Sequence, residues 1–160
     1  MFQRLGFGLG RGWTHNLGPR RVDSVTVVNR IVRIDNERND LVRFMPEMHL
    51  WIDRWDEQRW SWGPFLTVAP GSRIIDAVGF GLMMGYRPHR QDQYSFNVGI
   101  GGTLDLDARV LGDGLIANEP LPARETTART KQTTAAGLLV LFSVGWDLAA
   151  PHHPAHTERQ

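Results

Sequence analysis

The residues best suited to do chemistry lie close together in the middle of the chain. Glu47 and His49 are two positions apart, so both side chains would point to the same face of a strand. Together with Ser61 or Ser95, they could supply the nucleophile, base and orienting carboxylate of a lipid-modifying enzyme. The spacing gives this arrangement no specific support, so we keep it as the weaker alternative and predict no catalytic residue.

A second interpretation of the polar residues is structural. Charged and amide side chains recur at alternate positions of extended segments, and the candidates are Arg43, Glu47, His49, Asn97 and Asp105. In a small β-barrel, such side chains pair with one another in the lumen and fill it. We therefore expect them to face the lumen, and a proton relay or ligand site there is the less favoured explanation, since buried charges are usually paired.

Other motifs do not predict a cofactor or a metal. The Gly-x-Gly repeat within Leu5–Trp13 would need a preceding strand and a following helix to bind phosphate, and neither is evident. His152, His153 and His156 have no rigid acidic ligand beside them. The absence of cysteine excludes disulfides and thiol nucleophiles. The net charge of +1 comes with no basic stripe, so we predict no nucleic-acid partner.

The elements that must position these residues are β-strands. Between Asp76 and Asp107, large apolar residues alternate with small or polar ones, so each strand has an apolar face and a face of glycine, hydroxyl, amide and carboxylate groups. In a soluble barrel the apolar face would be inside, whereas in a transmembrane barrel it would contact lipid. Glycine is a poor covering for a solvent-facing strand surface, which favours the transmembrane orientation.

Seven segments qualify as strand candidates, and no helix is predicted. They are Leu5–Trp13, Val22–Ile34, Leu41–Ile52, Trp60–Ala69, two strands within Asp76–Asp107, and Glu125–Leu148. Bacterial single-chain barrels have even strand numbers, so we expect about eight. Residues 1–148 would form one barrel domain, and residues 149–160 a disordered polar tail. The longest loop, Leu111–Ala123, is the predicted site for a protein partner.

Aromatic residues lie near the ends of these strands. Such residues form girdles where a barrel meets the membrane–water interface. The predicted girdle consists of Trp51, Trp60, Trp62, Tyr86, Tyr94 and Trp146.

Several segments resemble those of small, uncharacterised bacterial outer-membrane β-barrel proteins, over roughly Leu41 to Leu148. The segments are Trp62-Gly63-Pro64-Phe65, Ile74–Gly79, Ser95–Gly101, Leu111-Gly112-Asp113-Gly114, Glu119–Pro122 and Gly137–Ser143. The motifs are structural, so the resemblance implies a fold and a location and no catalytic residues.

The sequence therefore predicts an all-β, antiparallel, up-and-down β-barrel of the transmembrane type. We expect a small integral protein of the outer membrane of a Gram-negative bacterium, in contact with membrane lipid, with a structural, adhesive or accessory role and no wide pore. Residues Met1–Gly6 do not form a secretory signal, so this interpretation predicts one upstream. Assembly into a homo-oligomer stays open. The alternative is a soluble, lipocalin-like barrel that binds an apolar ligand.

Overall fold

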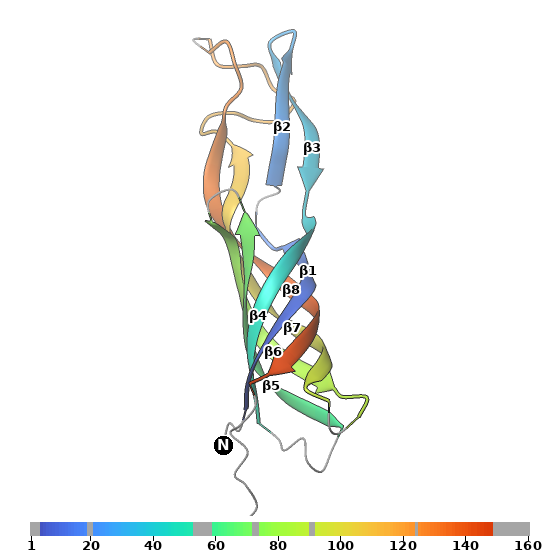
Figure 1. The fold of residues 1–160 in the computed structure, drawn as a ribbon. Helices are drawn as coiled ribbons and strands as arrows, with labels where there is room; N and C mark the ends of the chain where they lie inside the picture. Colours follow the sequence, from blue (N-terminus) through green and yellow to red (C-terminus); the bar gives the residue numbers. More distant parts are fainter. Residues whose placement is uncertain are drawn as a thin grey trace, which may run out of the picture.

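The computed structural model describes residues 4–18, 21–52, 59–71, 74–89, 92–123 and 125–148, which form eight β-strands (Figure 1). The predicted tail, 149–160, lies outside the described residues. The strands are β1 (Arg4–Asn16), β2 (Arg21–Val28), β3 (Ile31–Arg38), β4 (Asp40–Trp51), β5 (Trp60–Gly71), β6 (Ile74–Tyr86), β7 (Tyr94–Leu111) and β8 (Thr130–Asp147). Among the described residues, no helix is long and apolar enough to cross a membrane.

Six of the strands close into an antiparallel barrel in the order β1-β4-β5-β6-β7-β8, and β2 pairs only with β3 in a separate sheet. The closed all-β barrel is confirmed, but the prediction of about eight barrel strands is wrong. The segment Val22–Ile34, predicted as one strand, is split by a tight turn. Asn29 and Arg30 have φ angles of 53° and 62°. Two consecutive positive φ values are typical of the two-residue turn that joins hairpin strands.

Most of the large apolar side chains of the barrel face outward. Ile100 is 68% exposed and Leu82 is 60% exposed, and similar residues recur on all six barrel strands (Phe7, Leu9, Phe44, Leu66, Phe80, Phe96, Leu138 and Phe142 among them). The alternate positions of the same strands, such as Ser95 and Asn97, are buried in the interior. The alternation seen in the sequence is therefore a division between an apolar outside and an interior of small, polar and a few apolar residues.

A barrel of six strands explains why so many inward positions are glycine. Eight strands leave an interior that side chains just fill, and six leave less room. A Cβ atom at Gly12 would lie 2.2 Å from the Met45 Sδ, and one at Gly99 would lie 2.8 Å from the ring of Phe65. The glycines thus provide the space into which a small number of large side chains project from neighbouring strands.

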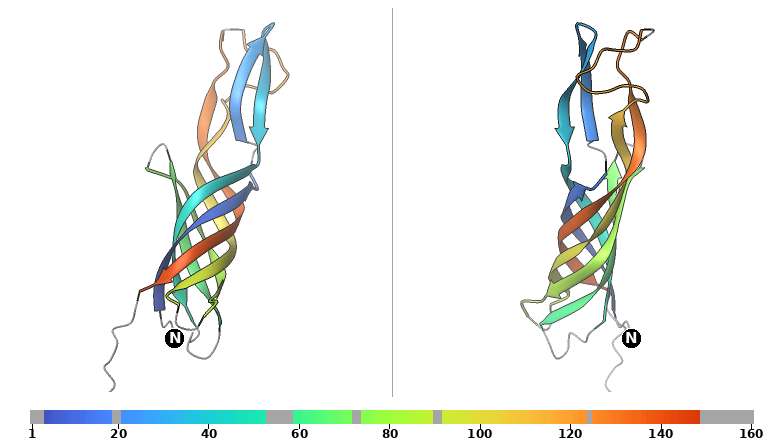
Figure 2. Two further views of the ribbon diagram at one scale, coloured as in Figure 1. Left: turned by 45° about the vertical axis from the view of Figure 1, so that its right-hand side comes forward. Right: turned by 180° about the vertical axis from the view of Figure 1, so that it is seen from behind.

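The strands β7 and β8 extend beyond the barrel, and their connection packs against the β2–β3 hairpin (Figure 2). Backbone hydrogen bonds join them: Asn118 N–H donates to the Val32 carbonyl at 2.8 Å, and Val32 N–H donates to the Glu119 carbonyl at 3.0 Å. Val32, Leu115 and Leu121 are buried together. We call β2, β3 and residues 112–123 the head. The predicted binding loop Leu111–Ala123 is therefore folded onto a hairpin.

The small apolar cluster should determine whether the head is ordered. We expect Leu121→Ala to lower the local stability of the head by about 2 kcal/mol, since it removes a buried side chain from a cluster with few neighbours. Leu121 is 5% exposed and Ile116 is 58% exposed, so Ile116→Ala is the matched control. Hydrogen exchange of the β2–β3 amides should accelerate in the first variant and not in the second. Equal exchange in both would show that the cluster does not stabilise the head.

Candidate functional site

The polar side chains of the interior form two clusters, one at each end of the barrel. The lower cluster is centred on Glu47 and lies toward the end at which β1 begins and β8 ends. Glu47 Oε2 lies 2.8 Å from His49 Nδ1, and the Ser143 hydroxyl donates to Glu47 Oε1 at 3.0 Å. The Asn97 amide contacts the Ser143 hydroxyl at 3.4 Å. Alternation along β4, β7 and β8 brings these four side chains to the same side of the sheet.

Asp147 closes the lower cluster. Its Oδ1 accepts a hydrogen bond from Trp51 Nε1 at 3.0 Å and lies 3.7 Å from His49 Nε2. The other carboxylate oxygen forms an ion pair with Arg87. The side chains of Arg87 and Asp147 are only 4% and 5% exposed. Arg87, Asp147 and Ser143 are not among the residues predicted to face the lumen, although Asp147 and Ser143 share the inward parity of Gly137, Leu139 and Gly145 on β8.

The lower cluster is a network of paired charges and not a nucleophilic triad. The His49 ring is held at Nδ1 by Glu47, whereas its Nε2 is buried, lies 3.7 Å from Asp147 Oδ1 and has no hydrogen-bond partner among the described residues. The Ser143 hydroxyl is bound to Glu47. The hydroxyls of Ser61 and Ser95 are buried and hydrogen-bond to none of the described residues. A base and a carboxylate are present, but no described serine is hydrogen-bonded to the base, as nucleophilic catalysis requires.

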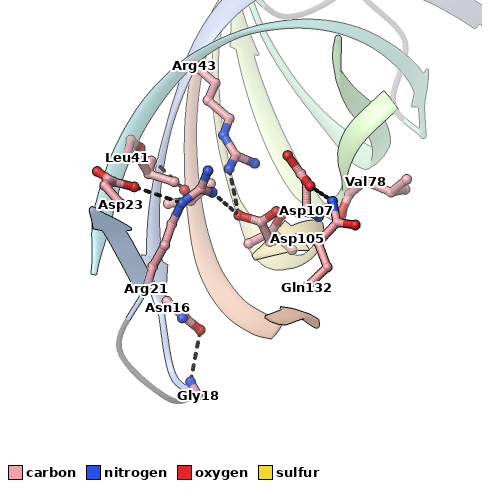
Figure 3. Close-up of polar contacts among 12 residues, drawn as sticks. Asn16, Gly18, Arg21, Asp23, Leu41, Arg43, Val78, Asp105, Asp107 and Gln132 are labelled. Atoms are coloured by element: carbon pink, nitrogen blue, oxygen red, sulfur yellow. Dashed lines mark hydrogen bonds and ion pairs between the residues drawn. The ribbon is translucent and has the colours of Figure 1, made fainter. Parts of the chain in front are cut away.

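The upper cluster lies where the barrel meets the head (Figure 3). Asp105 Oδ2 accepts hydrogen bonds from Arg43 Nη2 at 2.6 Å and from Arg21 Nη1 at 3.1 Å. Arg21 also forms an ion pair with Asp23 at 3.3 Å, and the Gln132 amide donates to Asp107. Since Arg21 belongs to β2 and Asp105 to β7, this cluster joins the hairpin to the barrel wall.

An apolar layer separates the two clusters and fills the middle of the interior. Met45, Phe65, Met83, Leu139 and Leu141 belong to it, each no more than 4% exposed. Of the predicted lumen residues, Glu47, His49 and Asn97 lie in the lower cluster. Arg43 and Asp105 lie in the upper one, so the five predicted residues are not brought together at one site.

The aromatic residues divide between the outside and the inside of the barrel. Trp60, Trp62, Tyr94 and Trp146 are exposed on the outer face, between 36% and 51%. Tyr86 packs against Trp60 with ring centroids 4.7 Å apart. Trp51 was predicted to belong to the girdle, but it is 0% exposed and points into the barrel. Its ring lies beside that of His49, with ring centroids 4.4 Å apart. It has the inward parity of Glu47 and His49 on β4.

No group of three or more potential metal-ligating side chains occurs among the described residues. The histidines His152, His153 and His156 lie outside them.

Comparisons of the chain with protein-family models, with curated proteins and with solved structures find no match.

Proposed function

We propose that this chain is a small integral β-barrel of the outer membrane of a Gram-negative bacterium, with a filled lumen and a structural, adhesive or accessory role. The observation behind the proposal is the outward-facing belt of large apolar side chains on all six barrel strands. A soluble barrel would leave this belt in water, whereas lipid would cover it. The lipocalin-like alternative needs these side chains inside and gains no support from their outward orientation.

The length of the belt is consistent with the proposal. On β7, exposed large apolar residues run from Tyr94 to Leu106, which is thirteen residues, and on β8 they run from Leu138 to Trp146, which is nine. A tilted membrane strand needs about 9–11 residues. The exposed aromatics Trp60, Tyr94 and Trp146 lie at the lower end of the belt, where an interfacial girdle is expected.

The position of the head indicates how the barrel is oriented in the membrane, and the head is also the proposed surface for recognition. It lies at the end of the barrel opposite to the start of β1 and the end of β8 (Figure 1). Barrels of this class have long extracellular loops. We therefore propose that the head projects outside the cell and that any protein partner binds there.

The first experiment tests for a membrane barrel directly. The full chain is refolded with and without detergent, and circular dichroism is combined with denaturing gels of heated and unheated samples. We expect a β spectrum that appears only in detergent, together with a band whose mobility changes on heating. A monodisperse β protein in plain buffer would overturn the proposal and direct attention to the soluble alternative.

A substitution on the outer face gives an independent test. Ile100 is 68% exposed on the barrel and Val28 is 47% exposed in the head. We expect Ile100→Arg to lower the unfolding free energy in lipid by about 2–4 kcal/mol near the midplane, because an arginine on the lipid face is costly. Val28→Arg, outside the belt, should change it by less than about 0.5 kcal/mol. Equal effects in a lipid-refolded sample would argue against burial of the belt in the membrane.

A further inference from the structure

A furrow crosses the outer face of the barrel between two rows of paired residues. The first row runs through Arg11, Phe142, Val98 and Met84, which are register partners on successive strands. The second row, two residues away on each strand, runs from Leu9 through Phe96 and Tyr86 to Trp60. The furrow between them has a volume of about 730 Å³. Ligand-binding clefts usually occupy roughly 300–1,000 Å³.

One end of the furrow is cationic. Arg11 is the single charged residue among those that line it, and apart from Gly10 and the polar Asn97 and Ser143 the rest are apolar or aromatic. Its neighbours across β4 and β8 are Phe44 and Phe142. No hydrogen bond or ion pair joins the Arg11 guanidinium to another residue in the described part of the chain. An exposed cation surrounded by apolar side chains is costly on a lipid-facing surface unless an anion from outside the protein neutralises it.

The position of Arg11 along its strand suits a lipid head group. The next outward residue on β1 is Trp13, whose ring stacks on His15, with centroids 6.0 Å apart, and His15 pairs with the exposed Asp40. Trp13 is 41% exposed, so on β1 the apolar belt ends at Trp13, one outward position above Arg11, and the polar His15 follows. At the far end of the furrow, Trp60 lies at the start of β5, in the lower aromatic girdle.

The dimensions suit an acyl chain. The second row crosses five strands, β1, β8, β7, β6 and β5, which are four intervals of about 4.8 Å and hence roughly 19 Å. This length is less than the thickness of a hydrocarbon core, about 30 Å, so an acyl chain that follows the row stays within the membrane.

We propose that this furrow binds a phosphate-bearing, anionic phospholipid. Its phosphate pairs with the Arg11 guanidinium, whose planar fork matches phosphate oxygens, and one acyl chain lies along the furrow toward Trp60. The inference rests on the proposed function, since the lipid must reach the barrel from a membrane.

The test is lipid selectivity in native mass spectrometry. Full-length protein is refolded in neutral detergent and mixed with equal amounts of phosphatidylglycerol and phosphatidylcholine of identical chains. We expect at least a five-fold preference for the anionic lipid, which falls to near parity in Arg11→Gln and is largely kept in Arg11→Lys. Arg33→Gln removes an equal charge from an exposed position in the head and should leave the preference unchanged. An excess of inorganic phosphate should not displace the lipid.

Each other outcome overturns the inference. Parity in the unmodified protein, a preference that persists in Arg11→Gln, or an equal loss in Arg33→Gln would exclude a site at Arg11. Displacement by inorganic phosphate would point to a simple anion site. Circular dichroism on the same samples separates the two proposals. A barrel that folds in detergent without lipid preference contradicts this inference alone, whereas a chain that folds only in buffer contradicts the membrane proposal and this inference with it.

Discussion

Replacement of Gly101 by alanine is expected to lower the unfolding free energy of the barrel by about 3 kcal/mol, at the upper end of the usual cost of overpacking. The added Cβ would lie 2.0 Å from the Phe80 carbonyl oxygen and 2.7 Å from the Cα of Gly81. Both are backbone atoms of the paired strand β6, so no side-chain rotation can relieve the contact. Strands β6 and β7 would have to separate where they close the wall of a narrow barrel.

The neighbouring residue provides the control. A Cβ at Gly102 would meet no atom closer than 3.8 Å. Gly102→Ala should therefore change stability by less than about 0.5 kcal/mol. Both variants are compared with the unmodified protein by urea unfolding in the same detergent. If the two alanine variants were equally stable, the close approach of β6 and β7 at Gly101 would not constrain the barrel.

Removal of the Glu47 carboxylate is expected to have a comparable or larger effect. In Glu47→Ala, His49 loses its partner at Nδ1 and Ser143 loses the acceptor of its hydroxyl, both deep in the interior. A buried polar group that loses its hydrogen-bond partner costs about 1–3 kcal/mol, and here both the His49 ring and the Ser143 hydroxyl lose theirs. Glu47→Gln should lose less, since the amide oxygen can still accept from Ser143.

An exposed pair serves as the reference for this measurement. Asp113 and Lys131 are 3.0 Å apart, with side chains 81% and 56% exposed. Solvent screens such a pair, so Asp113→Ala should change the unfolding free energy by at most about 1 kcal/mol. Both variants are measured by urea unfolding, as above. A loss in Glu47→Ala no larger than in Asp113→Ala would show that the lower cluster does not hold the barrel together.

The layered interior gives these predictions a common basis. Polar clusters occupy the two ends of the lumen and an apolar layer occupies the middle, so Glu47, Arg43 and Asp105 each depend on a few specific partners. The inward glycines leave room in this narrow lumen, and the large side chains of Met45 and Phe65 occupy the room at Gly12 and Gly99. Substitutions on the outer face meet no such constraint from the protein.

Much of the local structure could be predicted from the sequence because strand alternation is a local property. The two-residue period assigned Ile100 and Leu82 to one face and Asn97 and Glu47 to the other, and the structure divides them in the same way. The boundary of the hairpin was missed because Asn29-Arg30 lacks the glycine that usually marks such a turn. The position of Trp51 at a strand end suggested the outer girdle, whereas its parity with Glu47 and His49 places it inside the barrel.

The sequence by itself determined the all-β class, the two faces of each strand and the preference for glycine on one of them. Only the tertiary structure decided that six strands close the barrel and that β2 and β3 form a separate hairpin. It also decided that Asp147, Arg87 and Trp51 meet at the lower end of the barrel. The physical reason is range. Alternation depends on adjacent residues, whereas closure pairs β1 with β8 across most of the chain, and the width of the lumen follows from that closure.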